Sequence, residues 1–414
     1  MLVPANHVRG ISMRGLYSLL ALFGLAALGL VSSAGAANGH ANASAVCPAA
    51  VLDTARCQAL VVTDGRGNPN ATLAPTGYGP AEFHGAYSLG TSAPSAQTIA
   101  IVDAFDDPTA KADLDTYNST YGLSVFPSCS STITTSCFQK VNQNGAANPL
   151  PRKDSGWALE IALDVEIAHQ ICQNCKILLV EAKTNSFANL ATAVNTAATL
   201  GANAISNSYG GSESSSTNGG AFDHPGIAIT VSSGDNGYGV ESPASYSTVV
   251  AVGGTTLNLG SGNTYASESV WNGSGSGCSA YFTAQSWQTS LSNWATTGCG
   301  TKRGVADVAA DADPNTGASV YDSTPYQGQA GWFRVGGTSL SAPLIAGVYG
   351  LAGNVGVVNA STVPYPASIP YSNPASLHDV TSGSNGTCAT IMCNGATGYD
   401  GPTGVGTPNG TGGF

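Results

Sequence analysis

The chain carries little charge, and little of what it carries is positive. Only 9% of its 414 residues are charged, and 13 Lys and Arg stand against 24 Asp and Glu, a formal net charge of −11. So negative a net charge disfavours binding to phosphate backbones and anionic membranes, and we expect no nucleic-acid partner. The 42% of hydrophobic residues predicts a folded protein with a substantial core.

Long hydrophobic runs are also scarce. The run at 16–31 follows two arginines and precedes Ala34-Gly35-Ala36, an order typical of a secretory signal peptide. A membrane anchor is the alternative, but the run is short for a span and no stop-transfer pattern follows. We therefore expect residues 1–36 to be removed, which leaves 11 − 24 = −13 as the formal charge. The product would be secreted to the extracellular space or the periplasm, with no stable membrane anchor.

Ten cysteines remain after that cleavage. An even number in an exported chain favours disulfides, although sequence alone does not fix which cysteines pair. Our hypothesis joins nearest neighbours: Cys47–Cys57, Cys129–Cys137, Cys172–Cys175, Cys278–Cys299 and Cys388–Cys393. Cys172-x-x-Cys175 also resembles zinc or redox motifs, but no second ligand pair of suitable spacing accompanies it.

Strand-like and helix-like segments alternate between residues 97 and 252. This alternation predicts βαβ units, and so an α/β fold with a doubly wound, mostly parallel sheet and helices on both faces. The expected strands are 97–103, 176–181, 204–208, 227–232 and 249–252, and the expected helices are 106–121, 154–168 and 187–200. Residues 37–78 are expected to form an extended N-terminal arm pinned by the first cysteine pair. Residues 253–330 are expected to form loops and short hairpins within a single large domain, 79–414.

The stretch Val335–Ala352, VGGTSLSAPLIAGVYGLA, combines a glycine–serine turn with an apolar helix. Ser339 and Ser341 are expected to cap the helix, with Pro343 in its first turn. The helix is apolar nearly all round and should be buried. A hydroxyl at its head lies near free N–H donors, which suits a nucleophile whose reaction forms an oxyanion. An ordinary capped core helix is the alternative interpretation.

Three carboxylates lie at positions where they could take part in catalysis. Glu160 and Asp164 lie four residues apart on one face of the otherwise apolar helix 154–168, where like charges raise a pKa and favour a shared proton. A solvated acidic stripe that includes Glu166 is the alternative. Asp235 follows the strand 227–232 in a turn, and sites in open α/β sheets gather beyond the carboxyl ends of strands. Ordinary turn chemistry is the alternative there.

Together these motifs resemble the sedolisins, serine-carboxyl peptidases with a subtilisin-like fold. The resemblance covers roughly residues 79–408 and rests on GWALEIALDVE (Gly156–Glu166), SGDNG (Ser233–Gly237) and GGTSLSAP (Gly336–Pro343). Supporting matches are IAIVDAFDD (Ile99–Asp107), AVGGTTL (Ala251–Leu257) and DVAADADPNTG (Asp307–Gly317). GTSxSAP alone would also fit subtilisins.

The resemblance implies a serine-type endopeptidase with Ser339 as nucleophile, Glu160 as general base and acid, Asp164 as its partner and Asp235 as oxyanion stabiliser. Asp103, which ends the first strand, resembles in position the acid that subtilisins use; we rank it below Asp164. A carboxylate base and a protonated Asp235 both favour acidic conditions. Proteins or peptides are the implied substrates, and the strand-like SNSYGG (Ser206–Gly211) is a candidate for pairing with an extended peptide. We expect a monomer.

The family also carries one calcium site near its C-terminus. The resemblance implies one structural Ca²⁺ here, held by the side chains of Asp379 and Asp400 and the carbonyls of Val380, Ala396 and Gly398. Carboxylates and carbonyls are the hard oxygen ligands that calcium takes. A glycine-rich turn with chance acids is the alternative.

Two rival functions remain open. A subtilisin-type hydrolase would use a histidine as its base, although no histidine here lies in the HGT helix start that subtilisins use. The six histidines are His7, His40, His84, His169, His224 and His378. A non-catalytic exported protein with the same fold would bind peptides without turnover. The family usually has a long N-terminal propeptide. Here about forty residues separate the expected cleavage site from the first matching segment, so we do not extend the family's latency to this chain.

Overall fold

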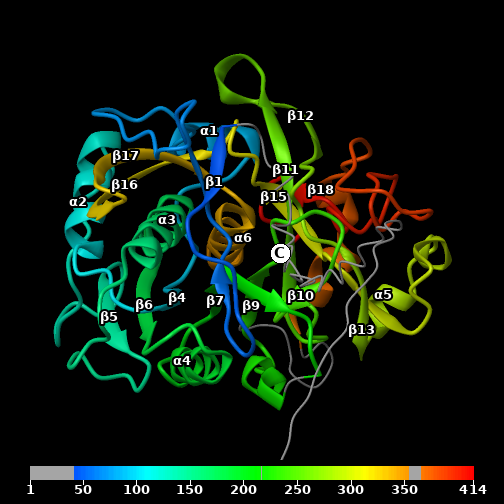
Figure 1. The fold of residues 1–414 in the computed structure, drawn as a ribbon, viewed down its shortest axis with the longest axis horizontal. Coiled ribbons are helices and arrows are strands. Elements are labelled where there is room, and N and C mark those ends of the chain that lie inside the picture. Colours follow the sequence, from blue (N-terminus) through cyan, green and yellow to red (C-terminus); the bar gives the residue numbers. More distant parts are fainter. Residues whose placement is uncertain (1–41, 216, 354–364) are drawn as a thin grey trace, which may run out of the picture. The chain divides into compact units, whose positions relative to one another are not determined.

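The central element is an eight-stranded sheet with the order β12-β11-β9-β7-β4-β6-β5, in which β15 also pairs with β11 (Figure 1). The computed structural model describes residues 42–215, 217–353 and 365–414; the expected signal peptide lies outside them. Every pairing in this sheet is parallel except that of β11 with β12. Its strands are β4 (Thr98–Ala104), β5 (Phe138–Asn142), β6 (Lys176–Ala182), β7 (Ala204–Asn207), β9 (Ala228–Ser232), β11 (Val250–Leu259), β12 (Tyr265–Val270) and β15 (Val308–Asp311).

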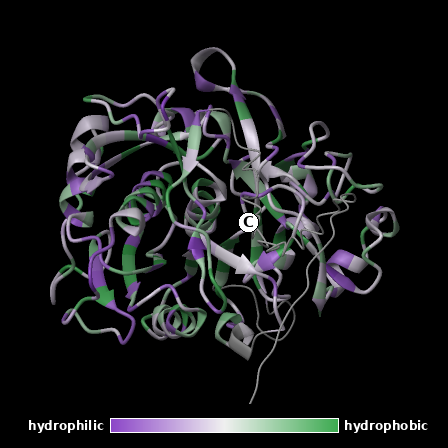
Figure 2. Ribbon diagram, viewed as in Figure 1, coloured by the Kyte–Doolittle hydropathy of each residue, from purple (hydrophilic) through white to green (hydrophobic). Residues whose placement is uncertain are grey.

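Helices lie on both faces of the sheet, which confirms the predicted doubly wound α/β fold (Figure 1). On one face α3 (Ser155–Ile171) packs against α6 (Thr338–Ala352), and α6 contacts β7, β9 and β11. On the other, α4 (Phe187–Thr199) packs on β4 and β6. The remaining helices are α1 (Pro80–Ala86), α2 (Ala110–Tyr121), α5 (Ser286–Thr289) and α7 (Ile369–Ser372). Figure 2 shows hydrophobic residues on α3, α6 and the strands beside them.

The two central helices begin in different ways. Asp154 caps α3 by accepting hydrogen bonds from the N–H groups of Gly156 and Trp157. In α6 the cap is Gly337, with φ 93°, and no side chain caps the helix, so the expected capping by Ser339 and Ser341 is wrong. Pro343 lies inside α6 rather than in its first turn, and its missing N–H releases the carbonyl of Ser339. The Ser208 hydroxyl donates to that carbonyl at 3.4 Å.

Residues 253–330 contain more strand than expected. β11 continues to Leu259, β15 joins the main sheet in parallel, and further strands follow: β13 (Gly277–Thr283), β14 (Lys302–Val305) and β16 (Ala318–Tyr326). β15, with the sequence VAAD, is fully buried. Its strand conformation comes from its neighbours in the sheet rather than from the weak strand preference of alanine and aspartate.

The described part of the N-terminal arm adds short strands to the core. β1 (Ala43–Ala45) pairs with β3 (Leu60–Val62), and β3 pairs with β17 (Gln329–Gly336), which pairs with β16. Along the chain between β1 and β3 lies β2 (Arg56–Cys57), which pairs with β8 (Tyr209–Ser212). The other neighbour of β8 is β10 (Glu241–Ser242). Strands β18 (Leu377–His378) and β19 (Thr407–Pro408) pair near the C-terminus.

All five expected disulfides are present in the structure. Cys172 and Cys175 are therefore joined to each other, which leaves no thiolate at this pair to bind a metal. Among the described residues no helix combines the length and the apolar character needed to cross a membrane.

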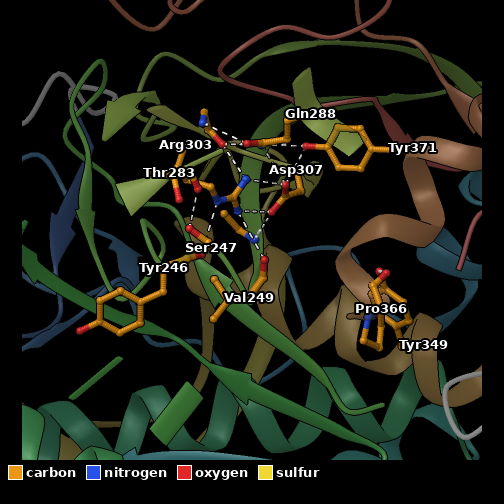
Figure 3. Close-up of polar contacts among 12 residues, drawn as sticks. Tyr246, Ser247, Val249, Thr283, Gln288, Arg303, Asp307, Tyr349, Pro366 and Tyr371 are labelled. Carbon is orange, nitrogen blue, oxygen red and sulfur yellow. Dashed lines mark hydrogen bonds and ion pairs between the residues drawn. The ribbon is translucent and has the colours of Figure 1, made fainter. Parts of the chain in front are cut away.

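A buried ion pair joins β14 to the start of β15 (Figure 3). The guanidinium of Arg303 binds both carboxylate oxygens of Asp307, at 2.7 Å through Oδ1 and by a shorter contact through Oδ2. Tyr371 donates to Oδ1 at 2.7 Å, and the N–H of Ala251 donates to Oδ2 at 2.7 Å. Both charges are shielded from water and have several hydrogen bonds, as a buried pair requires.

Removing one partner of this pair is expected to destabilise the fold strongly. Asp307→Ala leaves Arg303 buried and uncompensated, so we expect the free energy of unfolding to fall by about 3–5 kcal/mol. Asp115→Ala is the control, because Asp115 forms an exposed pair with Lys111 that is worth under ~1 kcal/mol. Urea denaturation compares the two; equal losses would show that the buried pair is not a major contributor.

Candidate active site

Ser339 is the second residue of α6 and is completely buried. Its hydroxyl donates to the carbonyl of Ser208 at 3.2 Å, and its N–H donates to the carbonyl of Gln58 at 3.4 Å. N–H groups in a first helical turn have no partner within the helix, and the helix dipole is positive there. The hydroxyl therefore lies where a developing negative charge would be stabilised.

Three carboxylates gather behind Ser339. Glu160 and Asp164, on the face of α3 that packs toward α6, are completely buried, and so is Asp103 in β4. Within the described chain none of their six oxygens has a hydrogen bond of normal geometry. The alternative of a solvated stripe is wrong, because Glu166 is buried as well.

Burial raises the pKa of all three carboxylates. The pKa of Asp103 rises to about 8, and the charge of Asp103 raises the pKa values of Glu160 and Asp164 further. The Ser339 hydroxyl works in the opposite direction by lowering the pKa of Glu160. Such a cluster titrates as a unit and holds shared protons at neutral pH. Asp103 therefore belongs to the group in which we had placed only Glu160 and Asp164.

Asp235 approaches α6 from the turn after β9. Its Oδ1 accepts hydrogen bonds from the N–H and the hydroxyl of Thr338 at 2.7 and 2.8 Å. Its Oδ2 has no partner among the described residues. Burial raises the pKa of Asp235 to about 7, so below that pH the carboxyl is protonated. With Oδ1 engaged as an acceptor, the proton belongs on Oδ2, which then becomes a donor beside Ser339.

The four described histidines have partners elsewhere. His169 is buried against Phe126 with ring centroids 4.1 Å apart. His84 contacts the carbonyl of Gln170 at 2.8 Å, His224 contacts Asn195, and His378 stacks on Tyr265. His7 and His40 lie outside the described residues. The structure thus brings carboxylates, and none of these four imidazoles, to Ser339.

The N-terminal arm covers the site. Cys57 of β2 pairs with Tyr209 of β8, and the N–H of Gln58 donates to the carbonyl of Ser208 at 3.1 Å. β3 then continues along β17 toward Gly336. Sequence reasoning missed Gln58, although it predicted that the SNSYGG strand could pair with an extended peptide. One feature of the sequence could have indicated a buried strand here: the apolar run Leu60-Val61-Val62, which follows shortly after a cysteine.

A small cavity of ≈ 230 Å³ lies beside this site, lined by Gly234, residues 236–241, Ser212 and Gly275. Glu241 in its wall accepts a hydrogen bond from the Gln58 side chain at 2.6 Å, and burial raises the pKa of Glu241. Another cavity, ≈ 560 Å³, lies at the ends of β5 and β6, and its lining includes none of the predicted catalytic residues.

The predicted calcium ligands lie together near the C-terminus. Asp379 accepts a hydrogen bond from the N–H of Gly398 and Asp400 one from the N–H of Ala396, both at 2.9 Å. Burial and the charge of Asp379 raise the pKa of Asp400 to about 8. Two carboxylates that repel each other are hard oxygen ligands of the kind that calcium takes, and an ion between them would neutralise both.

A second acidic group was not predicted. Carboxylate oxygens of Asp107, Asp113 and Asp322 lie within 4.8 Å of one another and are buried. It is the one group in the described chain where three such side chains converge closely enough to hold a metal.

Known proteins similar to this chain share its motifs. The sequence profile of the subtilase family matches residues 127–369, more than half of the chain. Sedolisin of Pseudomonas sp. (strain 101) is 29% identical over 80% of this chain, and kumamolisin of Bacillus sp. (strain MN-32) is 32% identical over 65% of it. The chain belongs to the sedolisin family of subtilases. It spans 59% and 52% of the lengths of these two relatives.

A solved structure of the same family has the same fold. It is Pseudomonas sedolisin, described as a serine-carboxyl proteinase complexed with two molecules of pseudo-iodotyrostatin. The likeness has a TM-score of 0.65 at 28% identity and covers 81% of this chain and 96% of that one. The sedolisin fold therefore accounts for most of the described residues.

Proposed function

We propose that this chain is a secreted serine-carboxyl endopeptidase that hydrolyses protein or peptide substrates through an acyl-enzyme. Ser339 is the nucleophile, Glu160 the general base and acid, and Asp164 positions Glu160. Asp235 is the oxyanion donor. The observation that carries the proposal is the placement of Ser339 between the carboxylate cluster and the free Oδ2 of Asp235. Sedolisin-family membership supports it.

The proposed reaction uses these groups in sequence. Glu160 takes the hydroxyl proton as Ser339 Oγ attacks the substrate carbonyl. The N–H of Ser339 and protonated Asp235 stabilise the oxyanion, at the positive end of α6. Glu160 then gives its proton to the leaving amine, and water hydrolyses the ester by the same steps in reverse.

The test compares the wild-type chain with Ser339→Ala. Casein is incubated at about pH 4, near the ordinary carboxylate pKa, and the peptides released are identified by mass spectrometry. Ser341→Ala is a matched control, because its hydroxyl lies in the same helix and only donates to the carbonyl of Thr338. We expect turnover by the wild type and the control and none by Ser339→Ala. Equal activity in all three would contradict the proposal, and binding of casein without turnover would favour the peptide-binding alternative.

We expect Asp235→Asn to keep part of its activity and to extend it to higher pH. The asparagine amide donates a hydrogen bond at every pH, whereas Asp235 loses its proton above a pKa of about 7. The measurement is kcat/KM against pH for both proteins. If kcat/KM falls at the same alkaline pH in Asp235→Asn as in the wild type, the ionisation of Asp235 is not what causes the fall.

We further propose that Asp379 and Asp400, with the carbonyls of Val380, Ala396 and Gly398, hold one structural calcium ion. Chelation at neutral pH is then expected to lower Tm by about 5 °C or more, because the ion binds only the folded state. Excess calcium should restore Tm. Asp379→Asn is the control and should have a low Tm that chelator does not change. A wild-type Tm that chelator leaves unchanged would count against a structural ion.

A further inference from the structure

Three acids that are distant in the sequence meet in the interior, away from Ser339. Asp107 lies just before α2, Asp113 lies within α2, and Asp322 lies in β16. We call these residues the acidic triplet; their carboxylate oxygens lie within 4.8 Å of one another, and none of the three is more than 2% exposed. α2 and β16 pack against each other and against α3, so the triplet lies between packed elements (Figure 1). Carboxylates this close repel one another unless protons or a cation offset their charge.

Two members of the triplet are each held through one oxygen and have the other free. Oδ1 of Asp107 accepts hydrogen bonds from the N–H and the hydroxyl of Thr109, both at 3.0 Å, and from the hydroxyl of Thr324 at 3.2 Å. Oδ1 of Asp322 accepts one from the N–H of Thr324 at 2.7 Å. Oδ2 of both acids has no partner among the described residues. Metal ligands are commonly oriented in this way, by neighbouring donors that leave another atom for the ion.

A fourth carboxyl group faces the triplet from α3. Oε2 of Glu166 accepts a hydrogen bond from the N–H of Tyr321, the residue before Asp322, at 3.0 Å. Its Oε1 has no partner in the described chain, although the side chain is only 1% exposed. Burial raises the pKa of Glu166, and the charges of all three triplet acids raise it further, so its carboxyl lies close to them. A buried carboxylate oxygen is rarely left without a partner, and this one therefore indicates a ligand beside the triplet.

The neighbouring lysines do not neutralise these acids. Lys140 pairs with Asp106 at 2.6 Å and donates to the main-chain carbonyl, not the carboxylate, of Asp107. Lys111 in α2 pairs with Asp115 at the surface. Among the described residues no ion pair joins a basic side chain to the triplet.

We propose that the acidic triplet binds a second calcium ion, separate from the one proposed at Asp379 and Asp400, with Glu166 as an outer partner of the ion. The converging donors are all carboxylate oxygens, without imidazole or thiolate, which suits a hard cation such as calcium rather than zinc or copper. The site does not depend on the peptidase function proposed above.

The few free oxygens predict weak binding. Calcium takes about six to eight oxygen ligands, so water must supply much of the shell, and we expect a Kd in the range of ~10⁻⁴–10⁻³ M that extracellular modules have. Without added calcium the purified protein would not fill this site. The chelation test of the C-terminal site is therefore independent of it.

Protons compete with calcium for the triplet. Burial raises the pKa of Asp107 to about 6 and that of Asp322 to about 8, so the group holds protons in acid and loses part of them near neutral pH. Metal ligands must be deprotonated, and binding should be strongest at neutral pH and above. There bound calcium would offset the repulsion that protons relieve in acid.

The response of Tm to added calcium at about pH 7.5 tests the proposal. It is measured in Asp379→Asn, which lacks a ligand of the C-terminal site. Because calcium binds the folded state, about 10 mM should raise Tm by about 2 °C or more, whereas magnesium at the same concentration should not. Adding Asp322→Asn should abolish the rise, and adding Asp115→Asn, at an exposed acid of α2, should keep it. The readout is the response to calcium, because removing a repelling carboxyl shifts Tm by itself.

A count of bound terbium, which replaces calcium at oxygen sites, provides a second measurement that needs no thermal transition. Equilibrium dialysis of the wild type should give one more bound ion per chain than Asp322→Asn, whether or not the C-terminal site is filled. Asp107→Asn should lose the same ion, which keeps the test decisive if Asp322→Asn does not fold. Equal counts in the wild type and the folded variants, a calcium response that survives Asp322→Asn, or an equal response to magnesium would overturn the proposal. The triplet would then hold shared protons only.

Discussion

Glu160→Gln is expected to lower kcat for peptide hydrolysis by about 10³-fold, within the usual contribution of a general base. The amide fills the same space in α3 but cannot take a proton from Ser339. The Glu160 carboxylate has no hydrogen bond of normal geometry within the described chain, so its burial against other acids is not explained by structural pairing. Steady-state kinetics on the purified protein in acid provide the measurement.

Glu166→Gln is the matched control for this loss. Glu166 lies on the same helix, is also buried, and accepts a hydrogen bond from the N–H of Tyr321 at 3.0 Å. The same substitution there disturbs packing to a similar extent but leaves Ser339 untouched, so we expect kcat to stay within about threefold of the wild type. Equal losses in the two variants would mean that Glu160 acts through folding rather than as a base.

The second large effect that we predict is a dependence of folding stability on pH. The protein is expected to be most stable in acid. Burial raises the pKa values of Asp103 and Asp322 to about 8 and that of Glu181 to about 9, whereas unfolded carboxyls titrate near 4. Between these limits unfolding releases protons, so each rise in pH favours the unfolded chain. The stabilisation is fully present below about pH 4 and is lost by about pH 8–9. One pKa unit is worth about 1.4 kcal/mol, so several groups together amount to several kcal/mol.

Urea denaturation with chelator present measures this effect without a contribution from bound calcium. The midpoint should be clearly higher at about pH 4 than at about pH 7.5. Asp322→Asn should weaken the dependence, because an amide at this buried position does not titrate. A midpoint that stays constant or rises toward neutral pH would show that these carboxyls are ionised in the folded protein.

The parts of the fold that the sequence predicts well are those whose local pattern agrees with their surroundings. The apolar helix 154–168 appears as α3 with Asp154 as its cap, and the strand 97–103 appears as β4 with a shift of one residue. The five neighbouring cysteine pairs form the expected disulfides. In each case short-range sequence information and tertiary packing favour the same structure.

The parts that were missed depend on distant partners. β15 is a strand because it pairs with β11, some fifty residues earlier, and the sequence VAAD alone does not indicate it. Asp103 joins the carboxylate cluster because β4 ends beside α3, which spacing along the chain does not show. The course of the arm over Ser339 follows from its pairing with β8 and β17, again a matter of register between distant segments.

The pH dependence of kcat/KM, measured with a soluble peptide, tests the proposed carboxylate mechanism most directly. Activity is expected at acidic pH and should be lost as the pH rises through about 7, where Asp235 loses the proton that it donates to the oxyanion. A profile that instead rises toward neutral pH, with the inflection near 6.5 that is typical of histidine, would contradict the mechanism. In that case the base would be an imidazole.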